Sequence, residues 1–235
     1  MRNELLLIAS LFVLFGMTIA WYKIFGRAGL YAFTAIATIA ANIEVLILVH
    51  AFGMDMTLGN VLFATTFTCT EILSEMEGKK YAKKAVWIGI CTTITFIIIS
   101  QSWFLFTPAE GDFVADSVKN VFTNSPRVML SSLVVYAICQ FVEVHIYSWI
   151  WKKMKNTERF LWVRSNVATL AAQVVNTVLF TTFAFLGVYD MKTLGEIMLT
   201  SYAIFIVTSL FDTPALYFAR WFCRKPATEP TAIAE

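Results

Sequence analysis

Stretches of mostly apolar residues, each close to the length that crosses a lipid bilayer, recur along this 235-residue chain. A membrane-spanning helix needs about 20 such residues. We predict seven spans, at residues 4–22, 30–53, 57–75, 85–106, 127–151, 161–187 and 196–219. Charged residues make up only 14% of the chain, against about 25% in soluble domains. The sequence therefore predicts an all-α protein, a polytopic membrane helix bundle that forms a single domain over residues 1–225.

The basic residues are unevenly distributed between the two ends of these spans. Of the 18 Lys and Arg residues, all but Arg2, Lys119, Arg127 and Lys192 fall on one side. Cytoplasmic loops carry the excess of basic residues in membrane proteins. We therefore predict an N-terminus outside and a C-terminus in the cytoplasm, with residues 226–235 as a disordered cytoplasmic tail. Between the fourth and fifth spans, residues 107–126 are compatible with either a short amphipathic helix on the outer interface or an ordered loop.

The span 161–187 carries a stripe of polar residues. The side chains that share this helix face are Asn166, Thr169, Gln173 and Asn176, spaced by three, four and three residues. Lipid offers no hydrogen-bond partner to an amide, so the face should look toward other helices or a wet cavity. Arg164 precedes the stripe, at the cytoplasmic end of the span.

Three other spans each carry an acidic residue at the depth of Arg164, namely Glu71, Glu143 and Asp212. An acid inside a membrane costs about 2.5–3.5 kcal/mol on insertion scales, so it needs a partner or a task. One interpretation is an ion-pair network in which Arg164 bridges acids and locks the helices together. The other is a polar cavity that holds a small molecule. Glu75, one turn from Glu71, lies either on the same face or at the interface among lysines.

The chemistry of these residues limits the ligand. Carboxylates accept hydrogen bonds in pairs, and amides both donate and accept. Such a set suits a planar, neutral or cationic, nitrogen-rich solute such as a guanine-like base, on which aromatic side chains stack. An anion is disfavoured, because only Arg164 would attract it. The candidate binding residues are Glu71, Gln140, Glu143, Arg164, Asn166, Gln173, Asn176 and Asp212.

Several segments resemble the queuosine precursor transporter family. They are LGNVLFATTFTCTEILSEMEGKK, VVYAICQFVEVHIYSWIWKK, ATLAAQVVNTVLFTTFAFLG and SLFDTPALY, in this order between residues 41 and 219. The resemblance implies a multi-pass protein of the bacterial inner membrane that imports 7-deazaguanine bases, precursors of the modified tRNA base queuosine. It also implies that Glu71, Gln140, Glu143, Gln173, Asn176 and Asp212 occupy the family's polar positions. Many members of the family have an Asp where this chain has Asn176, so a charge is missing here.

Other functional classes receive less support from the sequence. We find no HExxH, GxSxG or phosphate-loop motif, and therefore expect no enzyme, no cofactor and no metal ion. The four cysteines have no pair spacing that would indicate a disulfide framework or a metal site. The span 196–219 has no lysine for a retinal Schiff base, which disfavours a photoreceptor. The alternative function is a substrate-binding membrane subunit for another small nitrogen-rich vitamin or base, energised by a partner ATPase.

The expected partners follow from these interpretations. They are a purine-like small molecule and the lipid bilayer, with no nucleic acid, and the sequence is compatible with a homodimer. The roles of Glu44 and His145 stay open. Glu44 lies about 200° around its helix from Asn42, and His145 lies about 200° around from Glu143.

Overall fold

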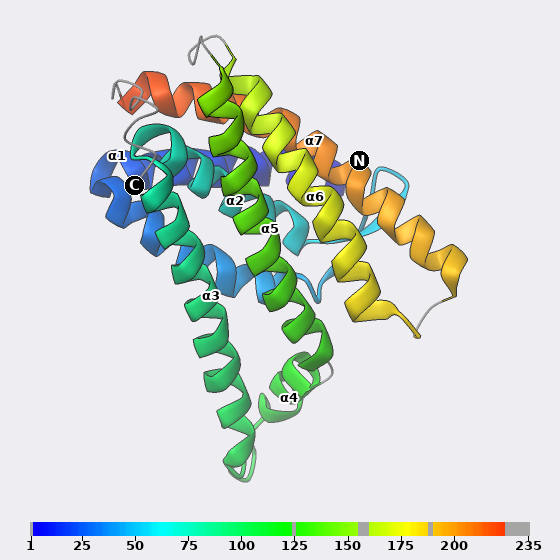
Figure 1. Ribbon diagram of the computed structural model, residues 1–235. Helices are drawn as coiled ribbons and strands as arrows, with labels where there is room; N and C mark the ends of the chain where they lie inside the picture. The colour runs from blue at the N-terminus through cyan, green and yellow to red at the C-terminus, as the bar shows by residue number, and fades with distance from the viewer. Residues whose placement is uncertain (1, 124–125, 155–159, 188–189, 224–235) are drawn as a thin grey trace.

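A computed structural model describes residues 2–123, 126–154, 160–187 and 190–223 of the chain. The helices are α1 (Arg2–Glu44), α2 (Gly59–Met76), α3 (Lys79–Ser102), α4 (Ala115–Thr123), α5 (Pro126–Lys153), α6 (Leu161–Phe185) and α7 (Met191–Cys223), with a short 3-10 helix at Trp103–Leu105 (Figure 1). Two short strands, β1 (Leu48–Ala51) and β2 (Met54–Thr57), form an antiparallel hairpin. The predicted helical class is confirmed, whereas the predicted tail 226–235 lies outside the described residues.

Five of the described helices are long and apolar enough to cross a membrane: α1, α5, α6, α7, and α3 extended through Leu105. The central helix α2, which is 18 residues long, is not among them, and it carries many Thr, Ser and Glu side chains. Its polarity is tolerated because every residue of α2 except Asn60 and Phe63 is buried by protein.

The 43-residue helix α1 reverses direction at Gly26. Gly26 has φ 61° and ψ −144°, a conformation that residues with a Cβ avoid. The rings of Trp21 and Phe33 lie 5.8 Å apart across the reversal, although twelve residues of straight helix would span about 18 Å. The predicted spans 4–22 and 30–53 therefore fall mainly on the two arms of α1, residues 2–25 and 27–44.

The second predicted span, 30–53, is wrong in its last part, because α1 ends at Glu44 and a hairpin follows. The run of apolar residues from 45 to 49 suits a strand as well as a helix, so the pattern alone could not distinguish them. Phe52 and Gly53 both have positive φ, as the favoured two-residue hairpin turn requires. The hairpin is held to the start of α1, since the Asn3 amide donates to the His50 carbonyl at 2.9 Å.

The opposite end of the bundle gathers basic residues. The Tyr22 hydroxyl donates to Glu77 Oε1 at 2.8 Å, and Lys23 Nζ donates to the Phe222 carbonyl at 3.1 Å. The Arg27 guanidinium lies 4.6 Å from the centre of the Tyr81 ring. The reversal of α1, the corner between α2 and α3 and the last turn of α7 thus meet at one end, here named the basic end. The other end, with the hairpin, is named the hairpin end.

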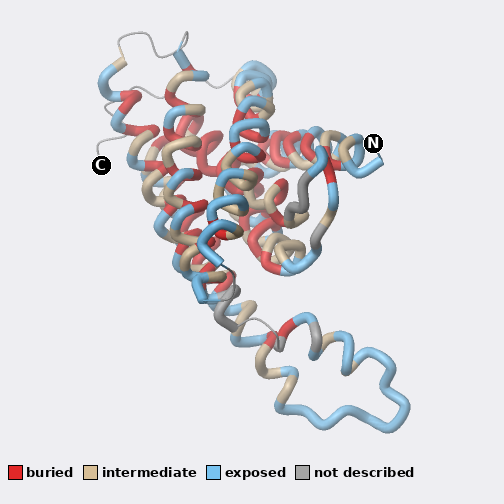
Figure 2. The backbone as a smooth tube through the Cα atoms, turned by 90° about the vertical axis from the view of Figure 1, so that its right-hand side faces the viewer, coloured by how far each residue is buried: buried red, intermediate tan, exposed pale blue. Residues whose placement is uncertain are grey.

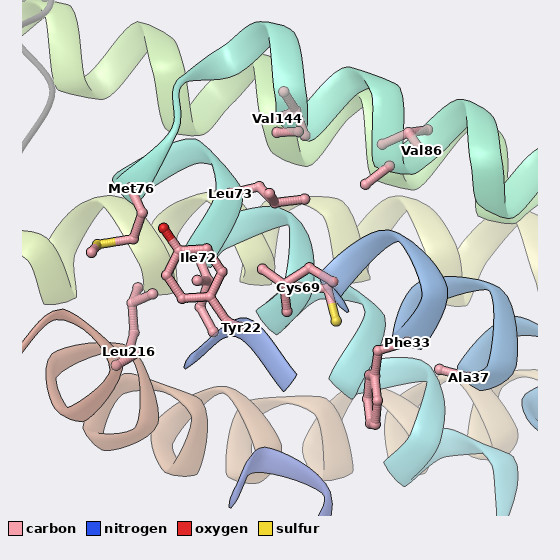
Figure 3. Packing of buried hydrophobic residues seen from close by; sticks show 14 of the residues in the cluster. Tyr22, Phe33, Ala37, Cys69, Ile72, Leu73, Met76, Val86, Val144 and Leu216 are labelled. Carbon is pink, nitrogen blue, oxygen red and sulfur yellow. The ribbon is translucent and has the colours of Figure 1, made fainter. Parts of the chain in front are cut away.

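The hydrophobic core forms around the half of α2 that lies toward the basic end. Figure 3 shows Ile72, Leu73 and Met76 of α2 packed among Tyr22 of α1 and Leu216 of α7, and all five side chains are buried. The remaining helices lie around this core, with α5 beside α6, and α6 beside α7 (Figure 1). This packing holds the polar side chains of α2 at the centre of the molecule.

The segment between α3 and α5 contains the short helix α4, as one of the two interpretations of residues 107–126 predicted. Figure 2 shows this segment projecting from the bundle, with most of its backbone exposed. It contributes nothing to the buried polar residues described next.

Candidate functional site

Polar side chains lie along the whole length of α2 and contact α5, α6 and α7. Thr68, Glu71 and Glu75 follow one another at spacings of three and four residues, so they share one helix face. Thr66 and Thr70 form a second row beside it. All five residues are fully buried, so each polar atom must find its partners inside the protein.

At the basic end, Glu75 is held by cationic and hydroxyl groups. Its Oε2 pairs with the Arg164 guanidinium and accepts a hydrogen bond from the Tyr147 hydroxyl at 2.8 Å. Its Oε1 lies 3.3 Å from Nη1 of Arg220. The Arg164 guanidinium also lies 4.5 Å from the centre of the Trp151 ring. These groups form a buried ion-pair cluster. The acid at its centre is Glu75, whereas the ion-pair interpretation of the sequence predicted that Arg164 would pair with Glu71, Glu143 or Asp212.

One turn further toward the middle, two carboxyl groups meet. Glu71 accepts hydrogen bonds from Ser165 at 2.8 Å and from Thr169 at 2.6 Å, both on α6. Asp212 of α7 accepts one from Thr68 at 2.7 Å. Thr68 precedes Glu71 by three residues on the same face of α2, so the Asp212 carboxyl lies close to that of Glu71.

A second polar row joins α2 to α5. Gln140 Nε2 donates to Thr66 Oγ1 at 2.8 Å. The Thr70 hydroxyl lies 3.2 Å from both Gln140 Oε1 and Glu143 Oε2. The other carboxylate oxygen of Glu143, Oε1, has no hydrogen-bond partner among the described residues, although the side chain is fully buried. A buried acceptor left without a donor is costly, and it marks Glu143 as a position suited to a ligand's N–H groups.

A cavity of about 70 Å³ lies between the Thr66 level and the hairpin end. The rings of three phenylalanines line it, those of Phe63, Phe180 and Phe205. Its polar lining comes from Thr38, Asn42, Asn60, Thr66, Thr93, Ser132, Tyr136 and Asn176. Asn42 Oδ1 has no hydrogen-bond partner in the part of the chain that the structure describes. The cavity combines flat apolar surfaces with hydrogen-bonding groups, which suits the lining of a site for a planar heterocycle, and at about 70 Å³ it has to widen to admit one.

The eight candidate residues differ in how they relate to this cavity, and only Asn176 is among its lining residues. Asn176 lines it, Gln173 contacts Asn176 through a 3.0 Å hydrogen bond, and Gln140 contacts the lining residue Thr66. Glu143, Glu71 and Asp212 lie next to this group, deeper in the bundle. Arg164 belongs to the ion-pair cluster instead.

Asn166 joins two helices rather than lining the cavity. Its Oδ1 accepts a hydrogen bond from Ser209 at 2.9 Å, and its Nδ2 donates to Thr213 Oγ1 at 2.5 Å. Both partners lie on α7, so the residue connects α6 to α7. Part of the polar stripe on α6 is thus occupied by contacts between helices.

Sequence reasoning did not select several cavity residues. Asn42 was visible as a lone amide in an apolar span, but nothing indicated which way it faced. Thr66, Thr93 and Ser132 carried almost no signal, because hydroxyl side chains in helices bond to their own backbone carbonyls and are common in membrane spans. The hydroxyl of Thr93 does so here, at 3.0 Å from the carbonyl oxygen of Gly89.

Comparison with known proteins places the chain in a family. Residues 57–219 match the family model described as "Putative vitamin uptake transporter". The chain belongs to this vitamin uptake transporter family. The matched region contains α2, α5, α6 and most of α7. It therefore includes all of the candidate binding residues, and every residue of the ion-pair cluster except Arg220.

A curated relative agrees with the transporter assignment. The protein named "Probable queuosine precursor transporter" from Bacillus subtilis (strain 168) is 36% identical over 206 residues, which cover 88% of this chain and 90% of that protein. The resemblance found in the sequence motifs is thereby confirmed. No solved structure matches the chain. Its membership of the vitamin uptake transporter family and its long apolar helices identify the chain as a multi-pass protein of the cell membrane.

Proposed function

We propose that this protein imports queuosine precursors, 7-deazaguanine bases such as 7-cyano-7-deazaguanine or 7-aminomethyl-7-deazaguanine, into the cell. The observation that carries the proposal is the similarity to the probable queuosine precursor transporter, which extends over nearly the whole length of both chains. The buried polar residues supply the chemistry that such a base needs.

Glu143 is the residue best suited to recognise the base. A guanine-like edge presents a ring N–H beside an exocyclic amine, and one carboxylate accepts both. Glu143 has a buried oxygen, Oε1, without a partner among the described residues, and its other oxygen has a single weak contact with Thr70. Gln140 and Asn176 then bind the remaining polar atoms of the base, while the rings of Phe63 and Phe180 stack on its faces.

The base must pass Thr66 to reach Glu143 from the cavity. The hydrogen bond between Gln140 and Thr66 separates the cavity from Glu143. In this proposal the arrangement is an occluded state, and the Gln140 amide turns from Thr66 to the ligand when the base enters. One protein–protein hydrogen bond is thereby exchanged for protein–ligand bonds, at little net cost.

The proposed topology has seven spans, with the basic end in the cytoplasm. The two arms of α1 and the buried helix α2 join α3, α5, α6 and α7 to make the seven, all within one transmembrane bundle. The positive-inside rule supports this orientation, because the described lysines and arginines concentrate at the basic end. The cavity then lies in the outer half, and the cluster of Glu75 and Arg164 closes the inner half.

Two assays test the proposal. Purified protein should gain thermal stability with 7-cyano-7-deazaguanine, but not with unrelated vitamins, since a ligand at about 100 times its Kd adds about 2.7 kcal/mol. Liposomes that contain only this chain should take up the radiolabelled base. Stabilisation without uptake would favour the alternative, a binding subunit that needs a partner ATPase. Stabilisation by a different vitamin alone would contradict the proposed substrate.

A further inference from the structure

A groove of about 620 Å³ lies on the outside of the bundle, at the basic end. Lys79, at the start of α3, and Lys152, in the last turn of α5, line it together with His145 and Trp149 of α5. The α6 residues Val167 and Ala171 form its opposite wall. It shares no lining residue with the cavity between Phe63 and Asn176.

The groove has a charged end and an apolar end. Lys79 and Lys152 supply two positive charges, and none of the residues that line the groove is acidic. His145 lies seven residues before Lys152, about 10 Å further along α5 toward the middle of the bundle. Val167 is 48% exposed and Ala171 is small, so the wall between the helices is apolar and shallow. A molecule that fills the groove would be anionic at one end and apolar along the rest.

Trp149 marks the level of the membrane interface within the groove. Its side chain is 57% exposed, and the ammonium group of Lys153 lies 3.9 Å from the centre of its ring. Trp side chains concentrate where the acyl chains meet the headgroups. The two lysines therefore lie at headgroup level, and Val167 and Ala171 lie at the level of the acyl chains.

We propose that this groove binds one anionic phospholipid, with phosphatidylglycerol as the reference ligand. Its phosphate contacts Lys79 and Lys152, and one acyl chain lies along Val167 and Ala171. Basic pockets between membrane helices bind acidic headgroups, because several cations converge on one phosphate. The inference rests on the membrane location of the chain and not on the identity of the transported base. It also places His145 at a lipid contact and outside the binding cavity.

Native mass spectrometry of the full-length protein, titrated with phosphatidylglycerol or phosphatidylcholine, tests the proposal. We expect one phosphatidylglycerol to be retained at concentrations where phosphatidylcholine is not. The double variant Lys79→Gln/Lys152→Gln should bind phosphatidylglycerol about tenfold more weakly, because two phosphate contacts are lost. The matched control Lys80→Gln/Lys83→Gln removes the same charge from neighbouring positions that do not line the groove, and should bind within about twofold of the wild type.

A third variant tests the apolar end. Ala171→Trp keeps the charge of the groove and fills the space beside Ala171. It should weaken phosphatidylglycerol binding about as much as the double variant Lys79→Gln/Lys152→Gln does. Equal binding of the two lipids by the wild type would overturn the proposal, as would equal weakening in the groove and control double variants. The unfolding temperature of every variant in phosphatidylcholine alone separates lost binding from lost folding. Retention of phosphatidylglycerol by folded Ala171→Trp would contradict the position of the acyl chain.

Discussion

Arg164 and Glu75 form an ion pair inside the bundle, and neither side chain is exposed to solvent. The pair joins α6 to the central helix α2, and Tyr147 and Arg220 extend it to α5 and α7. Four of the helices are therefore connected through one carboxylate. This arrangement gives a buried partner to the arginine that the membrane helix α6 carries.

Removing one partner of this ion pair should strongly destabilise the protein. Arg164→Met leaves the Glu75 carboxylate buried without its main partner, and breaking a buried pair in this way costs about 3–5 kcal/mol. Glu75→Gln likewise leaves the buried Arg164 guanidinium without the carboxylate that it pairs with. The double variant Glu75→Gln/Arg164→Met should recover part of the loss. Unfolding midpoints of the detergent-solubilised variants measure each effect.

The pair between Lys192 and Glu196 provides the control for that cycle. These side chains are 87% and 67% exposed and lie 4.0 Å apart on α7. Exposed pairs of this kind contribute little, so Glu196→Gln should unfold at nearly the wild-type midpoint. A buried pair that behaved like this exposed one would show that the cluster does not hold the helices together.

The close contact between Gly89 and Tyr136 predicts a defect in ligand binding. A Cβ on Gly89 would lie 2.1 Å from the Tyr136 hydroxyl oxygen, which is much closer than two non-bonded heavy atoms can approach. Gly89→Ala should push the Tyr136 ring into the cavity that it lines and weaken binding of the base. Tyr136→Phe in the same chain removes the closest atom and should restore part of the affinity.

Gly195→Ala is the matched control, because nothing lies within 4 Å of a Cβ at this position of α7. It should bind the base like the wild type and fold at least as stably, since Ala is the better helix former. Thermal shifts with and without 7-cyano-7-deazaguanine measure all three variants. Normal binding by Gly89→Ala would show that Tyr136 does not border the bound base.

Asn42 should contribute to binding at the expense of stability. Its Oδ1 is buried in the cavity without a partner among the described residues, so Asn42→Leu removes an unsatisfied acceptor. We expect the variant to be as stable as the wild type or more stable, while the affinity for the base falls about three- to tenfold. A loss of stability with unchanged affinity would assign Asn42 a purely structural role.

Asp190 should stabilise the start of α7 in a pH-dependent way. It accepts a hydrogen bond from the Thr193 hydroxyl at 2.5 Å and others from the backbone N–H groups of Thr193 and Lys192. The hydrogen bonds from Thr193 hold the pKa of this carboxyl below its usual range. Its contribution is therefore complete above about pH 4, the ordinary Asp value, and is lost as the pH falls through the lowered pKa.

Asp190→Ala should accordingly unfold at a lower temperature than the wild type at neutral pH. The difference between the two proteins should shrink as the pH falls below about 4, because the wild-type cap becomes protonated. Asp190→Asn keeps a capping side chain without a charge, so it should differ less from the wild type at neutral pH, and its advantage in unfolding temperature over Asp190→Ala should not depend on pH. If the difference in unfolding temperature between the wild type and Asp190→Ala grew as the pH fell, Asp190 would not act as the proposed helix cap.

The sequence predicted most of the helices and several of the buried polar residues, but not their pairing. Periodicity located α2, α5 and α6 to within two residues, because their apolar runs end at clear polar boundaries. It failed between residues 45 and 53, where an apolar run forms a hairpin. The spacing of residues shows which side chains share one face of a helix. The packing between helices decides that Arg164 pairs with Glu75 and not with Glu71. That packing does not follow from spacing along the chain.

The central claim, that Glu143 binds the transported base, is tested most directly by uptake into cells. Cells without an importer of their own should express the wild type, Glu143→Gln, Glu71→Gln or the control Glu196→Gln at equal membrane levels. We expect saturable uptake of radiolabelled 7-cyano-7-deazaguanine with the wild type and the control. Uptake with Glu143→Gln should fall at least tenfold, because charge-assisted hydrogen bonds contribute about 1.5–3 kcal/mol. Undiminished uptake by Glu143→Gln would contradict the account, and reduced uptake by Glu71→Gln alone would assign the base to Glu71 instead.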